Sequence, residues 1–430
     1  MRVPTLLGRL IATGLRLGAN DTRRAESLCR ALLSERGEAA GTALARETLD
    51  ACESVDDAGR ARLFDALARD FSPDPERVAR AAEAYRRDPS ATNQVRLQVA
   101  VEAPRQELFR RLNMAPGGTA ALVALRQRLL GALPQHPEWV AVDADLLHLL
   151  RSWFNRGFLV LKRIDWRSSA IVLEKLIQYE AVHEIKGWPD LHRRLESDRR
   201  CFAFFHPALP DEPLIFIEVA LTRGLAVRVQ PLLDVGAPLG DLRRARCAMF
   251  YSITNCQEGL RGVSFGNFLI KQVAEELRRE LPQLRVFATL SPIPGFGQWL
   301  HGQKQPGLER LGQRGWHEAK DTEALAARLM PLCARYLAQA KRGDDPLDPV
   351  ARFHLGNGAR LERINWLADT SPAGIESSAG MMVNYVYRLD QVEHNHELFV
   401  NEHRVIVSRH IERLLRERPS EARLPAGASA

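Results

Sequence analysis

The sequence predicts an α+β protein in which an all-helical N-terminal bundle is followed by a second domain of strands and helices. Between Thr22 and Arg151 apolar residues return every three or four positions, the spacing that lines one face of a helix. After Trp153 the chain instead carries short β-branched and aromatic runs, which are typical of strands. At 430 residues the chain exceeds one ordinary hydrophobic core, so we expect two domains, 1–151 and 152–418.

Turns are expected in the helical half at three places where proline or glycine interrupts the apolar spacing. Proline does not continue the helical hydrogen-bond ladder, and glycine ends a helix at little cost. The interruptions lie at residues 72–75, 116–118 and 134–137, and the helical spacing is clearest in Leu63, Phe64, Leu67 and Phe71. No cluster of catalytic residue types occurs in this half.

Five runs of the second domain have the composition of strands, and one segment has that of a long helix. The strands are expected at residues 201–205, 214–221, 248–253, 285–290 and 380–389, and the helix at Phe268–Leu281. Because strands and helices are interspersed, this domain is expected to be of the α/β or α+β type. Residues 419–430 are mostly small or polar, and we expect a disordered tail there.

The composition argues against several classes of partner. The net charge is +7, but arginines are scattered along predicted helices instead of forming a basic tract with aromatic residues, so nucleic acid is not the expected partner. A phosphorylated ligand accounts for the same charge. No apolar run is long enough to cross a bilayer. The apolar segment Met1–Asn20 superficially resembles a transit peptide, but a first amphipathic helix is the preferred interpretation.

Cysteine and histidine usage argues against a metal site. The six cysteines are far apart and include no CxxC pair, so neither a zinc site nor a dense disulfide framework is expected. His394, His396 and His403 lie close in sequence, but their spacing lacks the one-turn geometry of zinc-binding helices. We therefore expect no metal, and a reducing, cytoplasmic location.

A strand, a glycine-bearing turn and a helix follow one another near the middle of the second domain. The strand 249–253 leads through the loop 257–266 into a helix that begins at Asn267. A helix N-terminus suits a pyrophosphate because its N–H groups are unpaired and its dipole is positive there, and glycine lets the phosphate approach the backbone. The alternative interpretation is a simple turn or helix cap.

This turn resembles the acetyl-CoA turn of the GNAT acyltransferase fold, in which an Arg or Gln is followed by glycine at the third and fifth places. Arg261 and Gly266 fit that pattern, whereas Ser264 stands where glycine is usual; a serine is tolerable there if it does not need a positive φ. The resemblance implies that CoA is bound by Arg261, Gly262, Val263, Ser264, Phe265, Gly266 and Asn267.

A serine at the end of the strand 286–290 is the first catalytic candidate. Ser291 is followed by Pro292 and Pro294. Pro292 restricts Ser291 to extended dihedral angles, and both prolines stiffen the turn. The hydroxyl is then held in place before a ligand arrives. The alternative is that the Ser-Pro pair only ends a strand.

A histidine beside a Gly-Asn-Gly turn is the second candidate. His354 lies among apolar residues just before the turn 356–358. A lone histidine in such surroundings is more often a satisfied core residue. Asn365 and Asp369 follow it in the chain, and we expect them to brace the structure around His354 instead of taking part in chemistry.

Taken together, these segments resemble the malonyl-CoA decarboxylase family. The likeness rests on LSPIPGF around Ser291, FHLGNGA around His354, RINWLAD, EAVHEIK, and FYSI followed by QEGLRGVSFGNFLIK, and it extends from Trp153 to about Tyr387. It implies a GNAT-like catalytic domain with a mixed sheet. The helical half then fits a regulatory or oligomerising domain.

The resemblance also implies roles for single residues. The family's catalytic serine falls on Ser291 and its catalytic histidine on His354, while Tyr387, Lys175 and Asn384 match positions that support the site. It further implies a homo-oligomer, expected to be a tetramer.

In two respects the sequence departs from the family. Ser264 replaces an acidic residue that some members carry. The cysteines that form disulfides between subunits in some members are replaced by Ala170 and Pro207. We therefore expect no redox-linked oligomer.

The implied reaction, which belongs to fatty acid metabolism, converts malonyl-CoA to acetyl-CoA and carbon dioxide. Because the thioester carbonyl takes up the electrons of the broken bond as an enolate, no cofactor is expected. Ser291 would orient the carboxylate or relay a proton, and His354, with a reference pKa near ~6.5, would protonate the enolate. The alternatives are an acyltransferase on the same fold and a non-catalytic CoA-sensing protein. Selectivity between malonyl-CoA and methylmalonyl-CoA stays open.

Overall fold

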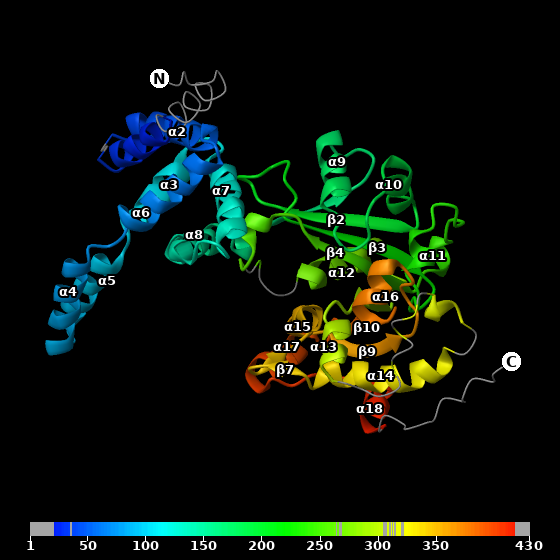
Figure 1. Cartoon of the computed structure of the whole chain (residues 1–430). Coiled ribbons are helices and arrows are strands. Elements are labelled where there is room, and N and C mark those ends of the chain that lie inside the picture. Colours follow the sequence, from blue (N-terminus) through cyan, green and yellow to red (C-terminus); the bar gives the residue numbers. More distant parts are fainter. Residues whose placement is uncertain are drawn as a thin grey trace, which may run out of the picture. The chain divides into compact units, whose positions relative to one another are not determined.

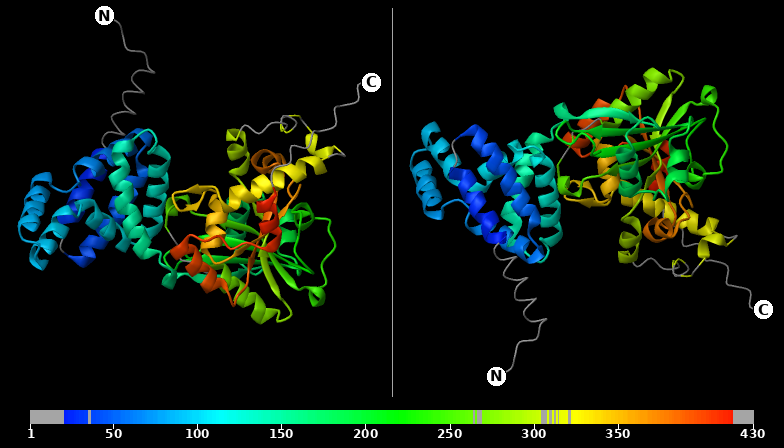
Figure 2. Two further views of the ribbon diagram at one scale, coloured as in Figure 1. Left: turned by 90° about the horizontal axis from the view of Figure 1, so that it is seen from below. Right: turned by 90° about the horizontal axis from the view of Figure 1, so that it is seen from above.

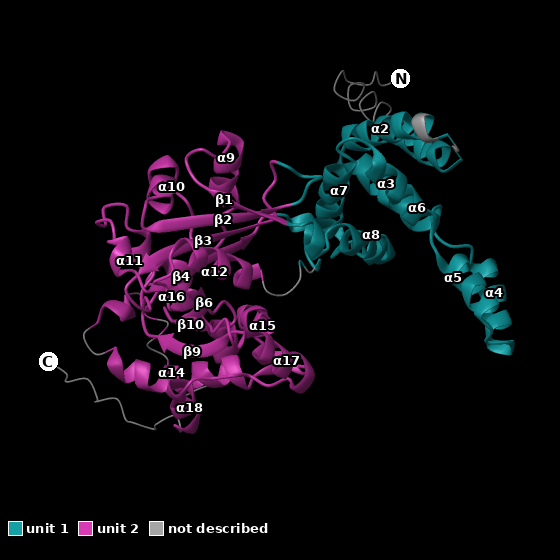
Figure 3. Cartoon of the chain, turned by 180° about the vertical axis from the view of Figure 1, so that it is seen from behind, with its two compact units in different colours: residues 1–159, 206–210, 257–265 teal, residues 160–205, 211–256, 266–430 magenta. Residues whose placement is uncertain are grey.

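The computed structural model describes residues 21–34, 37–263, 265, 269–303, 308, 311, 313, 315–319 and 322–417. The chain divides into two compact units, one of residues 1–159, 206–210 and 257–265 and the other of residues 160–205, 211–256 and 266–430 (Figure 3). The first amphipathic helix expected at Met1–Asn20 and the disordered tail expected at 419–430 lie outside the described residues.

The first unit consists of helices, as the sequence predicts (Figure 1, Figure 2). They are a helix over residues 21–34, α2 (Glu38–Ser54), α3 (Asp57–Arg69), α4 (Pro75–Arg87), α5 (Ala91–Val101), α6 (Pro104–Met114), α7 (Gly118–Ala132) and α8 (Val140–Trp153), with the 3₁₀ turns η1 (Pro137–Trp139) and η2 (Arg156–Phe158). The predicted interruptions fall between helices. At the first of them, Asp74 caps α4 by accepting from the N–H of Glu76 at 2.9 Å, and Pro75 occupies the first helical position, where its missing N–H costs nothing.

The second unit is built on an eight-stranded mixed sheet, in the order β1-β2-β3-β4-β5-β10-β6 with β9 beside β10. The strands are β1 (Val160–Ile164), β2 (Arg199–Phe205), β3 (Ile215–Thr222), β4 (Cys247–Asn255), β5 (Val286–Thr289), β6 (Ser291–Pro292), β9 (Arg360–Asn365) and β10 (Met382–Tyr387). Among the strand pairs described in this sheet, only β4–β5 is parallel. All five predicted strands are present. Because β2 and β3 are buried along almost their whole length, their sequences do not show a regular alternation of apolar and polar residues.

Helices accompany the sheet (Figure 1). They are α9 (Ala170–Tyr179), α10 (Trp188–Arg194), α11 (Gln230–Leu233), α12 (Leu269–Glu280), α13 (Phe296–Gly302), α14 (Glu323–Ala338), α15 (Pro349–Gly356), α16 (Pro372–Ser378), α17 (Val392–Glu402) and α18 (Arg409–Arg416), with the small hairpin β7 (Lys341–Arg342) and β8 (Asp345–Pro346). The helix predicted at Phe268–Leu281 is α12, and Phe268 lies outside the described residues.

The parallel pair β4–β5 diverges at one end, and this divergence positions the site. Their paired residues run from Cys247 opposite Val286 to Phe250 opposite Thr289. Beyond that point β4 continues beside β3, whereas the chain after β5 enters β6 and pairs with β10. A β-bulge at Tyr251 falls at the same place on β4, and a bulge bends its strand. Space therefore opens between the ends of two neighbouring strands.

Candidate active site

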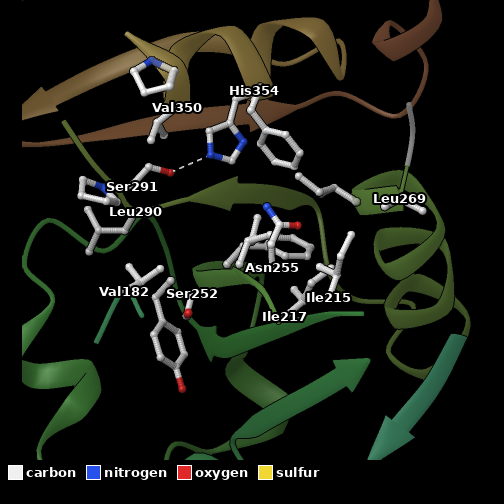
Figure 4. Close-up of a pocket in the computed structure, with 17 residues that line it drawn as sticks. Val182, Ile215, Ile217, Ser252, Asn255, Leu269, Leu290, Ser291, Val350 and His354 are labelled. Atoms are coloured by element: carbon white, nitrogen blue, oxygen red, sulfur yellow. Dashed lines mark hydrogen bonds between the residues drawn. The ribbon is translucent and has the colours of Figure 1, made fainter. Parts of the chain in front are cut away.

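A cavity of about 240 Å³ occupies the space where β4 and β5 diverge (Figure 4). Its walls are mostly apolar side chains of β3, β4, α12 and α15, and its polar groups include Ser252, Ser291 and His354. No Asp, Glu, Lys or Arg is among its described lining residues. A mostly apolar lining without charged side chains strengthens any hydrogen bond made against it.

Ser291 opens β6 and reaches the cavity from the end of β5. The backbone is fixed by pairing with Val383 of β10, and the residue is 5% exposed. Its hydroxyl donates to the Oγ1 of Thr289 at 2.9 Å and lies 3.0 Å from the Nε2 of His354 (Figure 4). The structure therefore brings together the two catalytic candidates, which are 63 residues apart in the chain.

His354 is presented by the last turn of the short helix α15. Asp348 begins this helix by accepting from the N–H of Ala351 at 2.8 Å, and Pro349 follows as its first residue. The Nδ1 of His354 lies 2.8 Å from the hydroxyl of Tyr387, and the imidazole stacks on Tyr385. Burial lowers the pKa of His354 to about 3, because the charged form is poorly solvated there. The imidazole is thus neutral near pH 7, which corrects the premise of a pKa near ~6.5.

The hydrogen-bond partners indicate where the protons of this cluster lie. Thr289 accepts from the N–H of Tyr385 at 3.2 Å and from the hydroxyl of Ser291. The Oγ of Ser291 is then an acceptor for the Nε2–H of His354. The Nδ1 of His354 accepts from the phenol of Tyr387. Burial raises the pKa of Tyr387 well above its usual value, so this phenol is protonated in the resting protein. The chain of donors runs from Tyr387 through His354 and Ser291 to Thr289.

Asn384 contacts the backbone of Thr289, and Asn365 contacts Asn384. Asn384 is fully buried, and its amide donates to the carbonyl oxygens of Thr289 at 2.7 Å and Ala226 at 3.2 Å. Its Oδ1 accepts from the amide of Asn365 at 2.9 Å. Asn384 therefore fixes the end of β5 from which Ser291 projects.

Lys175 and Asp369 lie outside the cavity wall. Lys175, on α9, forms an ion pair with Glu212 and donates to the carbonyl oxygen of Asp211 at 3.1 Å. Asp369 accepts from Gln230 at 3.0 Å and from the N–H of Ser371 at 2.9 Å. Both residues are occupied by contacts that hold loops together.

The expected CoA-binding turn is described in part. Arg261, Gly262, Val263 and Phe265 are described, and Gly262 has a positive φ of 83°, the left-handed conformation that glycine adopts freely. Ser264, Gly266 and Asn267 lie outside the described residues, so the expectation for Ser264 stays a prediction. The chain leads from this turn into α12, whose first residues Leu269 and Ile270 line the cavity.

Two polar residues of the site were not singled out from the sequence. Thr289 sits two positions before Ser291 on β5 and is fully buried. Ser252 lines the cavity on β4, and its hydroxyl donates to the carboxylate of Glu180, 2.8 Å from each oxygen. A threonine or serine inside an apolar strand is an available signal, because a buried hydroxyl needs a partner.

Within the described ranges, no group of three or more His, Cys, Asp or Glu side chains is arranged to hold a metal ion. In the same ranges no helix has both the length and the apolar character needed to cross a bilayer. His396, from the histidine cluster in α17, lies 2.7 Å from the carbonyl oxygen of Gly356 through its Nδ1.

The chain matches two family models that follow one another along the sequence. Residues 71–154 match the malonyl-CoA decarboxylase N-terminal domain and residues 157–424 match the malonyl-CoA decarboxylase C-terminal domain. Mitochondrial malonyl-CoA decarboxylase from Anser anser anser is 39% identical over 381 residues, which cover 78% of this chain and 76% of that protein. The protein of the same name from Mus musculus is 38% identical over 381 residues, 78% of this chain and 77% of that protein.

Solved structures are similar over nearly the whole chain. The crystal structure of malonyl-CoA decarboxylase from Rhodopseudomonas palustris aligns with a TM-score of 0.87 at 48% identity, and that from Agrobacterium vitis with a TM-score of 0.86 at 47% identity. Each alignment covers 91% of this chain and 99% of the other. The similarity therefore includes both the helical unit and the unit that carries Ser291 and His354.

Proposed function

The chain belongs to the malonyl-CoA decarboxylase family and is a decarboxylase, and we propose that it converts malonyl-CoA to acetyl-CoA and carbon dioxide without a cofactor. The carboxylate of malonyl-CoA is attached to the carbon next to the thioester carbonyl. When the carbon–carbon bond breaks, its electron pair passes into that carbonyl as an enolate. The substrate supplies its own electron sink, so the protein has only to bind, desolvate and protonate.

The observation that carries this proposal is the chain of hydrogen bonds from Tyr387 to Ser291, which ends at an apolar cavity. A carboxylate becomes neutral when it leaves as carbon dioxide. An enclosure lined by side chains such as Ile217, Phe250 and Leu290 disfavours the charged carboxylate more than the neutral product. The cavity therefore favours loss of carbon dioxide over retention of the anion.

His354 supplies the proton in its neutral form. The enolate carbon is basic enough to take a proton from a neutral donor, and Ser291 lies between the cavity and the Nε2–H of His354. Ser291 orients the carboxylate, then passes its proton to carbon and receives the proton of Nε2. As Nε2 gives up its proton, the Nδ1 of His354 takes that of the Tyr387 phenol. After the product leaves, the transfers among these three side chains reverse, and a proton from solvent restores the hydroxyl of Ser291. One proton is consumed in each turnover, as the reaction requires.

The experiment is incubation of the purified protein with malonyl-CoA and no acyl acceptor. We expect acetyl-CoA and carbon dioxide in equal amounts. Ser291→Ala and His354→Ala should each lower kcat by about 10²–10⁴-fold, the usual effect of losing a positioned acid, with an unchanged circular dichroism spectrum.

Three results would contradict the proposal. Malonyl-CoA that binds and stays intact would indicate a CoA-sensing protein. Acyl transfer to an added amine without release of carbon dioxide would indicate an acyltransferase. Wild-type turnover by either variant would remove Ser291 or His354 from the mechanism.

Other expectations from the sequence stay predictions. The homo-oligomer is tested by light scattering of the purified protein. The two curated relatives described above are named mitochondrial, whereas our expectation for this chain is a cytoplasmic location, which is tested by imaging the tagged protein in its own cell.

A further inference from the structure

The segment that holds the described part of the CoA-binding turn belongs to the helical unit, as Figure 3 shows in teal for residues 257–265. Its 3₁₀ turn η4 (Glu258–Leu260) packs on α7. A Cβ on Gly259 would lie 2.0 Å from the carbonyl oxygen of Val123, closer than atoms approach. Glycine is therefore required at position 259 by contact with α7.

Arg126 of α7 holds this turn through two backbone oxygens. Its Nη1 donates to the carbonyl oxygen of Gly259 at 2.7 Å and to that of Arg261 at 2.8 Å. Its Nε donates to Asp143 of α8 at 2.7 Å, and the side chain is only 2% exposed. A buried guanidinium is costly unless it is paired and hydrogen-bonded, and here the turn supplies two of its three acceptors.

Arg151 of α8 acts on the next carbonyl. Its Nε and Nη2 lie 3.3 Å and 3.2 Å from the carbonyl oxygen of Gly262. Because a peptide group is planar and trans, directing the carbonyl of Arg261 towards Arg126 directs the N–H of Gly262 the opposite way. Within the described part of the chain that N–H has no hydrogen-bond partner.

We propose that Arg126 and Arg151 are positioning residues for the CoA pyrophosphate, an inference that rests on the proposed function. They draw the carbonyl oxygens of the turn towards α7 and α8. The negative ends of these peptide dipoles are then neutralised, and the N–H of Gly262 is left for the phosphate. Arg126 and Arg151 thereby affect substrate affinity through the turn and do not contact the reacting atoms.

The test compares malonyl-CoA with malonyl-pantetheine, a substrate that lacks the pyrophosphate. In the full-length protein, Arg126→Met should raise KM for malonyl-CoA about tenfold, equivalent to the loss of one charge-assisted hydrogen bond, while kcat stays within about twofold. Arg151→Ala removes a more exposed side chain and should raise KM about threefold. Neither variant should change kcat/KM for malonyl-pantetheine.

Arg105 provides the matched control. It is also a buried arginine of the helical unit, 3% exposed, paired with Asp145 of α8 at 2.5 Å, and it donates to the carbonyl oxygen of Leu67 at 3.2 Å. It makes no hydrogen bond to the turn. Arg105→Met should lower Tm and leave KM for malonyl-CoA unchanged.

Calorimetric titration with CoA separates this inference from the proposed function. If the wild type does not turn over malonyl-CoA but still binds CoA about tenfold more tightly than Arg126→Met, the proposed function is wrong and the inference stands. The inference is overturned if Arg126→Met and Arg151→Ala keep the wild-type KM and Kd. It is also overturned if Arg105→Met raises KM equally, or if the loss extends to malonyl-pantetheine. If Arg126→Met does not fold, the result for Arg151→Ala decides.

Discussion

Thr289 decides which way the protons of the site point. Because its Oγ1 accepts from the backbone N–H of Tyr385 and from the hydroxyl of Ser291, the hydroxyl oxygen of Ser291 faces the Nε2–H of His354. Without this acceptor, the proton of Ser291 would be free to turn towards His354. The tautomer of His354 thus depends on Thr289, which no pattern in the sequence singled out.

Replacing Thr289 by valine tests this dependence. Thr289→Val keeps the β-branched shape but removes the acceptor, so we expect kcat to fall by about tenfold, the worth of one hydrogen bond in the transition state. Thr289→Ser keeps the acceptor and should stay within about threefold of wild type. Steady-state kinetics with malonyl-CoA make the measurement. Equal rates for Thr289→Val and wild type would show that the Ser291 proton is not directed by Thr289.

The lowered pKa of His354 gives a prediction for the pH profile. With a pKa of about 3, the imidazole is neutral in the free enzyme above about pH 4, and the neutral form is the proposed proton donor. Titration of His354 should therefore not change kcat/KM between pH 5 and 8. The value of kcat/KM should fall only at lower pH, where the imidazole becomes protonated. An inflection near pH 6.5 that disappears in His354→Gln would refute the neutral-donor mechanism.

At the scale of elements, the site depends on where short segments begin and end. Helix α15 has eight residues, begins at the Asp348 cap and is followed by a left-handed Gly358 with φ of 79°. A Cβ at Gly358 would lie 2.0 Å from the carbonyl oxygen of Val392, where α17 begins. The Gly-Asn-Gly turn seen in the sequence is thus the point at which α15 and α17 come together.

Gly358→Ala should therefore disturb the position of His354. The left-handed backbone costs about 1 kcal/mol for alanine, and the clash with the backbone of Val392 adds to it, so we expect the free energy of unfolding to fall by about 2 kcal/mol or more, together with kcat. Gly356→Ala is the control, since its Cβ would meet only the ring of Phe399 at 3.7 Å. Denaturant titration of both variants makes the comparison. Equal stability would contradict the close approach.

At the scale of the whole molecule, the structure is divided between a helical unit and a unit that carries the chemistry. The two family models meet between residues 154 and 157, and the compact units change near residue 159. The helical unit also includes residues 206–210 and 257–265. Two short segments that the family models assign to the C-terminal domain therefore belong to the helical unit in the fold.

The folding stability of the whole molecule depends on pH through two buried histidines. Burial lowers the pKa of His183 to about 4 and that of His354 to about 3. Below about pH 6.5 the unfolded chain binds protons at these sites that the folded chain does not, so stability present above that pH is lost as pH falls towards 4. The expected loss is at most about 1.4 kcal/mol per pH unit for each histidine.

Unfolding by denaturant between pH 7 and 4.5 measures this loss. His183→Gln and His354→Gln should each show a smaller decline in stability on acidification than the wild type. A decline that is identical in all three proteins would mean that neither histidine is buried in its neutral form.

Much of the architecture followed from the sequence because its causes are local. Apolar spacing placed the helical half, proline and glycine placed its turns, and apolar runs located all five predicted strands. The strands β1, β6 and β9 were not predicted. β1 and β9 carry several charged residues, β6 has only two residues, and all three are defined by pairing with distant segments. The family resemblance, carried by motifs around Ser291 and His354, was confirmed by the family models and relatives.

The sequence by itself thus determined the two-part organisation, the family and the two side chains proposed for the chemistry. Only the tertiary structure decided how those side chains are used. The neutral state of His354 depends on burial by residues remote in sequence, and the direction of the Ser291 hydroxyl depends on Thr289 and Tyr385. The contact of Arg126 with the turn at Gly259 joins residues 133 positions apart. Desolvation and hydrogen-bond direction are properties of packed neighbours, and no local pattern encodes them.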